Sequence, residues 1–374
     1  MKILLLGTYP YDERGSMQRF TRILFSDLSN LGHDVRVVYP DTVFAKLKPS
    51  KDGFGKWLGY IDKFFLFPKK LTRELSWADI IHIPDHSDSI YVKYVRNFPH
   101  VVTCHDLIAI RSAHGELNEK STMWTGKMLQ RIILDGLKKA GHVVCVSQTT
   151  KQDLLRLSLR NPMNTSMAYL DLDKAYHPMG KSEAIDHLRH LGINNYFPFM
   201  LHVGQEKWYK NRIGVLEIFY YLKQIDRIKN LYLIFVGDIL SNEMNRFITK
   251  HNLHNHIKAL PFLGINDVRA FYSSAEFLLF PSYYEGFGWP IAEAQACGCP
   301  VFTTNKQPMT EVGRDAAIYI DPHKPREAAD IIAGNLGGLD AARNKGFQNI
   351  KRFQTNEMAK HYVRIYQRVL NESL

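Results

Sequence analysis

The sequence predicts an α/β protein of two domains, each a parallel sheet covered by helices. Three observations support this prediction. The chain has 374 residues, which is enough for about two domains with separate cores. Short apolar runs typical of buried parallel strands alternate with helical patterns. This alternation restarts near residue 199, and only helical patterns follow residue 322. The restart and the terminal helices disfavour the main alternative, a single closed α/β barrel.

The composition is that of a globular protein, with 45% hydrophobic and 23% charged residues. No apolar run approaches the roughly 20 residues that a membrane-spanning helix needs, and the first apolar run is too short for a signal peptide. The four cysteines include Cys297 and Cys299, which lack the second pair of a zinc site. We therefore expect a reducing, cytoplasmic location and no zinc site at these cysteines.

The net charge of +11 favours an anionic partner. Nucleoside diphosphates and acidic lipids are the candidates. The basic residues are dispersed along the chain, and no nucleic-acid-binding motif is present. Nucleic acid is therefore not an expected partner.

The first domain is expected to span residues 1–170. Its predicted strands are short apolar runs at residues 2–7, 35–39, 80–83, 101–104 and 142–146. The helix between the first two strands has one apolar face, formed by Phe20, Ile23, Leu24, Leu28 and Leu31. Such a β-α-β unit places the loop before the helix at the carboxyl edge of the sheet, where ligands bind.

Residues 53–71 interrupt this pattern, because large apolar side chains from Trp57 to Phe67 are interleaved with lysines. We favour a buried helix with basic edges. The alternative is a surface patch that contacts anionic lipid, which would place the protein at the inner face of the membrane.

The second domain is expected to span residues 171–355. The stretch 171–198 contains Pro178, Gly180 and Pro198 and is expected to form the crossing between domains. Strands are predicted beyond it at residues 199–203, 231–236, 256–260, 277–280 and 300–303.

The most informative segment covers residues 277–305 and predicts a strand, a glycine loop, a helix and a strand. Pro281 ends the first strand, and Gly286 and Gly288 lie in the loop. Pro290 suits the first helical position, where a missing N–H costs nothing. The start of this helix would point free backbone N–H groups at the carboxyl edge of the sheet. An anionic ligand is expected there.

Two carboxylates frame this loop: Glu285 precedes it, and Glu293 follows eight positions later in the first helical turn. Carboxylates repel phosphate, so we expect them to accept hydrogen bonds from hydroxyl groups. A nucleotide diphosphate sugar has a phosphate centre with hydroxylated rings on both sides and would satisfy the whole arrangement. A dinucleotide-binding loop is disfavoured, because Ile291 occupies the third glycine position. A glycosidase carboxylate pair is the other alternative.

The run EGFGWPIAE, residues 285–293, resembles the E-x7-E signature of the retaining family 4 glycosyltransferases. The likeness continues through Cys297 to Pro300 and through Glu311-Val312. It implies the GT-B fold, in which two Rossmann-like domains face each other across a cleft. The first domain would bind the acceptor and the second the donor, and the C-terminal helix 356–374 would pack back on the first domain. The resemblance also implies retention of configuration and no metal or other cofactor.

The resemblance assigns donor-binding roles residue by residue. Glu285 would contact hydroxyl groups of the donor sugar, and Glu293 would bind the ribose. The backbone between them would face the sugar and the diphosphate, which adds Gly286, Phe287, Gly288, Trp289 and Pro290 to the donor site.

Lys210, followed by Asn211, matches the diphosphate-binding lysine of the family. Gln205 stands where the family has an arginine, so Lys207 or Arg212 is expected to supply the second positive charge.

Four further positions come from the same resemblance. Gly15 matches a glycine of the loop that approaches the diphosphate, although the neighbouring glycine is absent. Phe262 and Leu263 belong to the loop that holds the base, mainly through the backbone. His105, in the pair His105-Asp106, would lie near the reacting sugar. The expected catalytic residues are therefore His105, Lys210 and Glu285.

We expect a retaining hexosyltransferase that uses UDP-hexose, such as UDP-glucose, and a glycan or lipid-linked glycan acceptor in surface polysaccharide biosynthesis. A GDP-mannose-dependent mannosyltransferase is the alternative. Two rivals belong to other classes: a nucleotide-sugar 2-epimerase, which needs no acceptor, and a non-catalytic sugar-nucleotide-binding protein. Asp171 and Asp173 imitate the metal motif of a different glycosyltransferase fold, and we interpret this match as chance.

Overall fold

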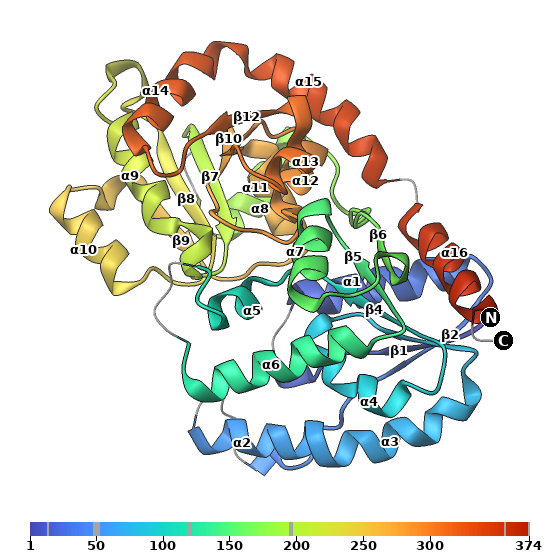
Figure 1. Ribbon diagram of the computed structural model, residues 1–374. Helices are drawn as coiled ribbons and strands as arrows, with labels where there is room; N and C mark the ends of the chain where they lie inside the picture. Colours follow the sequence, from blue (N-terminus) through green and yellow to red (C-terminus); the bar gives the residue numbers. More distant parts are fainter. Residues whose placement is uncertain (13–14, 48–52, 118–121, 194–196, 355–356, 373–374) are drawn as a thin grey trace. The chain divides into compact units, whose positions relative to one another are not determined.

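The computed structural model describes residues 1–374 except 13–14, 48–52, 118–121, 194–196, 355–356 and 373–374. The chain divides into two compact units (Figure 1). Unit 1 comprises Met1–Asp171 with Asn356–Leu374, and unit 2 comprises Leu172–Thr355. Each unit contains one six-stranded parallel sheet. The prediction of two α/β domains is confirmed, and two open sheets exclude a single closed barrel.

Unit 1 has the strand order β2-β1-β3-β4-β5-β6. Its strands are β1 Lys2–Leu6, β2 Asp34–Val38, β3 Ile80–Ile83, β4 His100–Cys104, β5 His142–Cys145 and β6 Thr165–Met167. Its α-helices are α1 Gly15–Asn30, α2 Gly53–Ile61, α3 Phe67–Glu74, α4 Val92–Val95, α5 Ile108–Ala113, α6 Trp124–Lys139, α7 Gln148–Ser158 and α16 Glu357–Asn371. The 3-10 helix η5 spans His86–Tyr91. The strand order reverses between β1 and β3, which makes that edge the switch point of this sheet.

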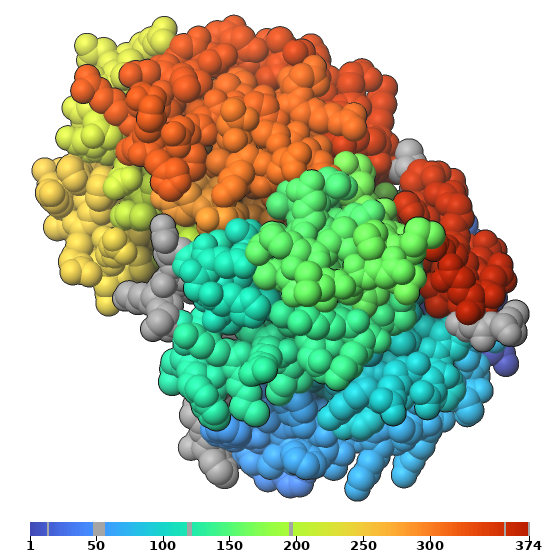
Figure 2. All heavy atoms as spheres, in the orientation of Figure 1, coloured from blue at the N-terminus to red at the C-terminus, as the bar shows by residue number. Residues whose placement is uncertain are grey.

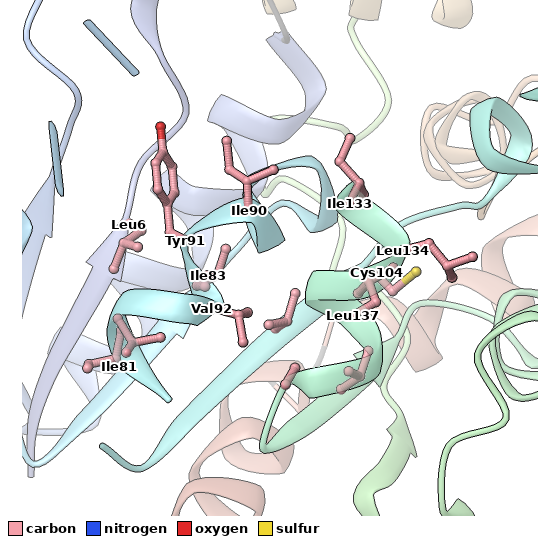
Figure 3. Packing of buried hydrophobic residues seen from close by; sticks show 14 of the residues in the cluster. Leu6, Ile81, Ile83, Ile90, Tyr91, Val92, Cys104, Ile133, Leu134 and Leu137 are labelled. Atoms are coloured by element: carbon pink, nitrogen blue, oxygen red, sulfur yellow. The ribbon is translucent and has the colours of Figure 1, made fainter. Parts of the chain in front are cut away.

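Helices α3, α4 and α6 pack against one face of this sheet around an apolar core (Figure 3). The core joins side chains from strands and helices, among them Leu6, Ile81, Ile83, Phe67, Leu71, Tyr91, Val92, Ile133, Leu134 and Leu137. On α1, the predicted apolar face is buried at Phe20, Leu24 and Leu28. The prediction is wrong for Leu31, which is exposed because the helix ends at Asn30.

The segment 53–71 forms α2, a π-helical turn η3 at Asp62–Leu66, and α3. Asp62 is fully buried and accepts hydrogen bonds from the hydroxyl of Tyr9 (2.8 Å) and from the backbone N–H groups of residues 43–45 (2.9–3.2 Å). One carboxylate with four donors is fully satisfied, so it fixes this segment against the loops that follow β1 and β2.

The favoured interpretation of that segment as a buried helix is only half right. Its inner face is buried at Leu58 and Phe67, but Trp57 is 61% exposed and Phe65 is 68% exposed. The apolar residues run around the helix, so the sequence alone does not show which of them lack a partner.

The C-terminal helix α16 is held in unit 1 by a buried chain of hydrogen bonds. The ring of His82 bonds the hydroxyl of Tyr366 (2.6 Å) and that of Thr103 (2.7 Å), and Thr103 also bonds the hydroxyl of Tyr362 (2.7 Å). Burial lowers the pKa of His82 to about 3, so the ring is neutral. These contacts join α16 to β3 and β4.

Unit 2 has the strand order β12-β11-β10-β7-β8-β9. Its strands are β7 Phe199–Gly204, β8 Tyr232–Gly237, β9 Ile257–Leu260, β10 Phe277–Phe280, β11 Val301–Thr304 and β12 Ala317–Ile320. Its α-helices are α8 Lys181–His190, α9 Arg212–Leu222, α10 Asn242–Lys250, α11 Ile265–Ser274, α12 Trp289–Ala296, α13 Met309–Gly313, α14 Pro325–Asn335 and α15 Leu339–Asn349. The switch point of this sheet lies between β7 and β10.

Two short strands and one helix were not expected. The sequence analysis assigns no strand to β6 or β12, which have three and four residues. It takes residues 171–198, at the start of the second domain, as a crossing; the stretch belongs to unit 2 from Leu172 onward and contains α8, which packs against α11. Within the described residues, no helix is both long enough and apolar enough to cross a membrane.

Candidate functional site

The two loops at the switch point of unit 2 meet through an ion pair. Lys210 follows β7, and Glu285 follows β10. The Nζ of Lys210 lies 2.6 Å from Oε1 of Glu285, and both side chains are largely buried, at 15% and 8% exposure. The sequence predicts both residues at this edge. The structure adds that the two side chains are each other's partners.

Backbone and side-chain hydrogen bonds hold the two loops together. The N–H of Tyr283 donates to the carbonyl of Tyr209 (2.8 Å). Asn211, at φ +53°, accepts from the N–H of Gly214 to cap α9 and donates through Nδ2 to the carbonyl of Pro281 (both 3.2 Å). Asn211 therefore starts the helix and fixes the neighbouring lysine beside the second loop. The sequence analysis notes this residue only as part of a motif.

The predicted glycine loop ends at Gly288, directly before α12. Gly288 has φ +98°, a conformation that favours glycine. Phe287 and Trp289 are buried, so a ligand at this loop would meet mainly their backbone. Helix α12 begins at Trp289, one residue earlier than predicted, and Pro290 lies in its first turn. The helix start lies at the carboxyl end of β10, as the sequence analysis expects.

Glu293 is 3% exposed and accepts a hydrogen bond from the hydroxyl of Tyr272 on α11 (3.0 Å). Burial, together with the neighbouring carboxylate, raises the pKa of Tyr272 well above its usual value. The tyrosine therefore stays protonated and orients the carboxylate. Tyr272 is absent from the sequence analysis, because a tyrosine on an apolar helix gives no signal of its carboxylate partner.

Arg212 is not available as the second cation. Its guanidinium is 1% exposed and is held by the carboxylate of Glu206 (2.6 Å) and by the carbonyls of Asp238 (2.9 Å) and Ile239 (3.2 Å). It ties the end of β8 to the start of α9. Lys207, the other expected cation, is exposed and forms no ion pair within the described residues.

A third lysine near this edge was missed. Lys306 follows β11, the strand beside β10, and its Nζ lies 4.0 Å from the ring centroid of Tyr284. Tyr284 directly precedes Glu285, and its ring also contacts the indole of Trp208 at a centroid distance of 5.7 Å. The position of Lys306 after a predicted strand was the available sequence signal, but the residue belongs to no motif.

The expected base loop lies farther along the same edge. Phe262 is exposed and Leu263 is half-buried, directly after β9. Three strand spacings separate β9 from β10, which is about 14 Å. The structure therefore lays the expected sugar, phosphate and base contacts in a row along one edge.

Two predicted site residues lie in unit 1. Gly15 is the first residue of α1 and is exposed, and a Cβ built on it would meet nothing within 4 Å. Packing within the unit therefore does not require glycine there. His105 follows β4 and is buried. The centroid of its ring lies 4.9 Å from that of Phe20.

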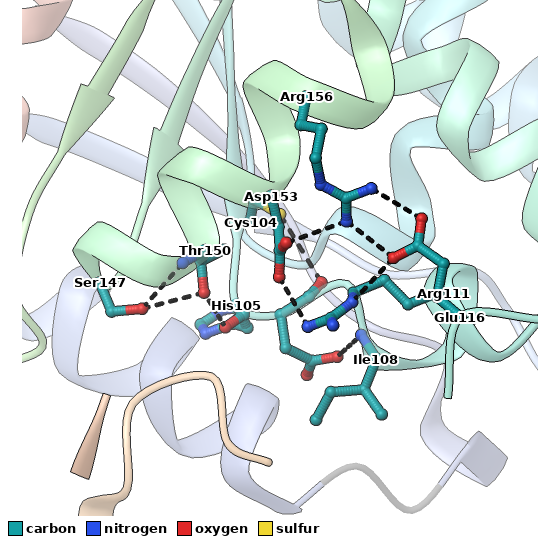
Figure 4. A network of polar contacts seen from close by, with 10 residues as sticks. Cys104, His105, Ile108, Arg111, Glu116, Ser147, Thr150, Asp153 and Arg156 are labelled. Atoms are coloured by element: carbon teal, nitrogen blue, oxygen red, sulfur yellow. Dashed lines mark hydrogen bonds and ion pairs between the residues drawn. The ribbon is translucent and has the colours of Figure 1, made fainter. Parts of the chain in front are cut away.

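Figure 4 shows the surroundings of His105. Its Nε2 donates to the carbonyl of Pro84 (2.8 Å), and Nδ1 has no hydrogen-bond partner within the described residues. Burial lowers the pKa of His105 to about 4, so at neutral pH the ring is uncharged and Nδ1 is an acceptor. The carboxylate of the following Asp106 accepts from the N–H of Ile108, the first residue of α5 (3.0 Å).

The same view shows a charged network that ties α5 to α7. Arg111 contacts Glu116 (3.2 Å) and Asp153 (2.9 Å), and Arg156 contacts the same two carboxylates (2.7 and 3.1 Å). This network fixes the loop after His105.

Asp171 and Asp173 have structural contacts. Asp171 is buried and accepts from the N–H of Met358 at the start of α16 (3.3 Å). Asp173 accepts from the N–H of Ala175 (3.1 Å). These contacts agree with the interpretation of their spacing as chance.

Comparison with known proteins gives two family matches. The model of Glycosyltransferase Family 4 matches residues 17–163, and that of Glycosyl transferases group 1 matches residues 185–336. A relative, the O-antigen chain mannosyltransferase B of Escherichia coli, is 23% identical over 307 residues, which cover 79% of this chain and 77% of that protein.

Two solved structures share the fold. The sucrose-phosphate synthase of Thermosynechococcus elongatus has a TM-score of 0.75 with 18% identity and covers all of both chains. HepE of Anabaena, solved in complex with UDP-glucose, has a TM-score of 0.76 with 18% identity, over 98% of this chain and 99% of that chain.

Proposed function

Because the chain is a glycosyltransferase of the GT-B type, with a family 4 domain followed by a group 1 domain, we propose that it moves a hexosyl group from a nucleotide diphosphate sugar to a glycan. Unit 2 would bind the donor and unit 1 the acceptor. Retention of configuration and independence of metal belong to this proposal and rest on the E-x7-E resemblance.

The Lys210–Glu285 ion pair at the switch point is the observation that carries the proposal. Removing one partner of a buried ion pair is costly unless another group takes its place. Ligands bind at the carboxyl edge of a sheet at its switch point, so we infer that a ligand replaces part of this pair. A diphosphate offers negative charge to Lys210, and a sugar offers hydroxyl groups to Glu285. A nucleotide diphosphate sugar is one molecule that satisfies both partners together.

The proposed roles of these residues follow from where negative charge develops during the reaction. As the bond between sugar and diphosphate breaks, negative charge develops on the departing phosphate. Lys210, Lys207 and the backbone N–H groups at the start of α12 would stabilise it. Glu285 would orient the donor sugar, and Glu293, oriented by Tyr272, would bind the ribose.

His105 has a neutral ring with an acceptor nitrogen. On the resemblance of His105-Asp106 to the His-Asp pair of the family, we assign His105 to the side of the reacting sugar. The proposal uses no covalent nucleophile on the protein.

Two donor substrates are considered. UDP-hexose is the first expectation, because it is the commonest type of donor. The likeness to an O-antigen chain mannosyltransferase favours a mannosyl donor, for which GDP-mannose was the expected alternative. The same likeness supports a glycan or lipid-linked glycan acceptor and a place in surface polysaccharide biosynthesis.

A donor screen tests the proposal. Thermal shift and turnover would be measured with UDP-glucose and GDP-mannose, each with and without a glycan acceptor. Transfer of sugar from at least one of the two donors to the acceptor supports the proposal. Release of free nucleotide with an epimerised sugar and no acceptor would favour the 2-epimerase. Binding without any turnover, even to water, would favour the non-catalytic protein.

A further inference from the structure

Two aromatic rings and a lysine lie together beside the Lys210–Glu285 ion pair of unit 2. The indole of Trp208 contacts the ring of Tyr284 at a centroid distance of 5.7 Å, and the Nζ of Lys306 lies 4.0 Å from the centroid of the same tyrosine ring. We call Trp208, Tyr284 and Lys306 the aromatic–lysine cluster. The roles proposed above for the donor site leave this cluster unused.

The two rings belong to the loops that carry the ion pair. Trp208 lies in the 3-10 helix η7, Trp208–Lys210, so it shares one short turn with the lysine of the pair. Tyr284 directly precedes Glu285, the carboxylate of the pair. The rings therefore lie at the same edge of the sheet as the residues to which donor binding is assigned.

Lys306 reaches Tyr284 from the neighbouring strand, β11. The hydroxyl of Thr304, the last residue of β11, donates to the carbonyl of Ser282 (2.8 Å), and the N–H of Lys306 donates to the carbonyl of Thr304 (2.8 Å). These two bonds hold the start of the loop after β11 beside the loop after β10. Both loops belong to the orange part of the chain, which forms much of the visible face of unit 2 in Figure 2.

The cluster has the chemistry of a site for an acidic sugar. Lys306 is exposed, and Trp208 and Tyr284 are half-buried. A half-buried aromatic ring presents an apolar surface on which the C–H face of a sugar ring can pack. A cation–π contact contributes little at an exposed site, so a carboxylate or phosphate can draw Lys306 into a stronger, charge-assisted hydrogen bond.

The strand order indicates which part of a ligand Lys306 would meet. Strand β11 lies on one side of β10, and β7, β8 and β9 lie on the other. Lys210 after β7, the proposed diphosphate contact, and the expected base loop after β9 are therefore separated from Lys306 by Glu285. An anionic group at Lys306 would belong to a sugar and not to the nucleotide.

We propose that the aromatic–lysine cluster is a subsite for a sugar ring that carries a carboxylate or a phosphate. The rings of Trp208 and Tyr284 pack on the sugar, and Lys306 pairs with its acidic group. The sugar has two sources: a donor whose transferred sugar is a uronic acid, or an acidic acceptor glycan. This inference rests on the proposed function, and the net charge of +11 favours an acidic ligand.

Binding of matched acidic and neutral sugars tests the subsite without turnover. Calorimetry with UDP-glucuronic acid and UDP-glucose is the donor arm. Saturation-transfer NMR with methyl glucuronide and methyl glucoside, in the presence of UDP, is the acceptor arm. In at least one arm, wild type should bind the acidic sugar roughly fivefold more tightly than the neutral one, and added salt should reduce this ratio.

Variants assign the preference to the cluster. Lys306→Met should bring the ratio of acidic to neutral affinity to about one. Tyr284→Leu should weaken both sugars, whereas Tyr284→Phe, which keeps a ring, should bind them like wild type. The matched control, Lys93→Met, removes another exposed lysine whose Nζ lies 4.8 Å from a ring centroid, that of Tyr94, and should keep the wild-type ratio. Unchanged circular dichroism and Tm establish that each variant folds.

The arm that shows the preference identifies the source of the acidic sugar. Absence of binding in both arms, equal affinity for acidic and neutral sugars in both, or an unchanged ratio in Lys306→Met overturns the proposal. An equal loss of affinity for UDP alone in Lys306→Met also overturns it, in favour of a diphosphate contact. The donor screen reports on the proposed function separately: sugar transfer without an acidic preference removes the subsite alone, and an acidic preference without transfer removes the transferase activity alone.

Discussion

The carboxyl edges of the two sheets are built in different ways. In unit 2, charged side chains from neighbouring loops contact each other, as Lys210 and Glu285 do. In unit 1, the polar side chains contact backbone: His105 donates to the carbonyl of Pro84, and Asp106 accepts from the N–H of Ile108. A ligand can replace one member of a side-chain pair, whereas contacts to backbone fix a geometry. The comparison indicates an exchangeable charged pair in unit 2 and, in unit 1, a neutral His105 held by contacts to backbone.

The largest expected difference between the units concerns pH. Burial lowers the pKa of six described histidines in unit 1, namely His33, His82 (to about 3), His100, His105 (to about 4), His142 (to about 4) and His361. In unit 2 it lowers the pKa of two, His202 (to about 3) and His256. Below pH 6.5 these histidines become protonated in the unfolded chain but stay neutral in the folded protein. Stability is therefore full above pH 6.5 and falls as the pH drops toward 4. Each histidine costs at most about 1.4 kcal/mol per pH unit.

Unit 1 should therefore lose more stability than unit 2 as the pH falls, and its three most strongly shifted rings alone contribute at most about 4 kcal/mol per pH unit. Hydrogen exchange of peptides from β3–β5 and from β7–β10, at pH 7 and pH 5.5, measures the stability lost by each unit. His142→Gln should reduce the pH dependence of the stability of unit 1. Equal acid sensitivity of the two units would break the comparison.

The next effect is on catalysis. Glu285→Ala should lower kcat more than a hundredfold, a loss of roughly 3 kcal/mol or more in transition-state stabilisation, because the donor sugar loses its carboxylate partner. Steady-state turnover with the donor found by the screen measures it. Glu327→Ala removes an exposed carboxylate paired with Lys324 and serves as the control. Near-normal turnover of Glu285→Ala would remove this residue from the site.

The ion pair itself predicts an effect of opposite sign on binding. Glu285→Gln should bind UDP or GDP without a sugar roughly tenfold more tightly, since the diphosphate no longer meets a carboxylate beside Lys210. The affinity that the sugar adds should fall in the same variant. Calorimetry gives the ratio of the affinity for the sugar nucleotide to the affinity for the diphosphate alone, and Glu327→Gln is the control. A ratio equal to that of wild type would show that the pair does not couple the two ligand parts.

The smallest expected effect separates two glycines. Gly288→Ala should lower stability by about 1–2 kcal/mol, because alanine is strained at φ +98°. Gly15→Ala starts a helix in open space and should leave stability unchanged or slightly raised. Thermal unfolding of both variants gives the comparison. Equal losses would show that backbone conformation at Gly288 is not the constraint.

Local patterns were sufficient to predict most of the fold. The strands β3 and β10 lie where predicted, because continuous apolar runs bounded by polar residues leave little choice of register. The short strands β6 and β12 were missed, since three or four residues carry no periodicity. Residues 171–198 were taken as a crossing because proline and glycine mark loops, yet α8 forms between them.

The site was predictable where a motif names a residue, and not where only tertiary contacts do. Glu285 and Lys210 belong to motifs, and the structure brings them together. Tyr272 and Lys306 contact residues of this edge from other elements and belong to no motif. The exposure of Trp57 was also invisible, because a helical apolar stripe reads the same whether it faces a core or solvent.

The central claim is that the charged edge of unit 2 binds a nucleotide diphosphate sugar. Calorimetric titration of UDP-glucose and GDP-mannose into wild type and Lys210→Ala tests it most directly, with the exposed Lys324→Ala as control. We predict that at least one donor binds wild type and that Lys210→Ala weakens it roughly tenfold or more, while Lys324→Ala does not. Absence of binding by both donors, or equal affinity of wild type and Lys210→Ala, would contradict the account.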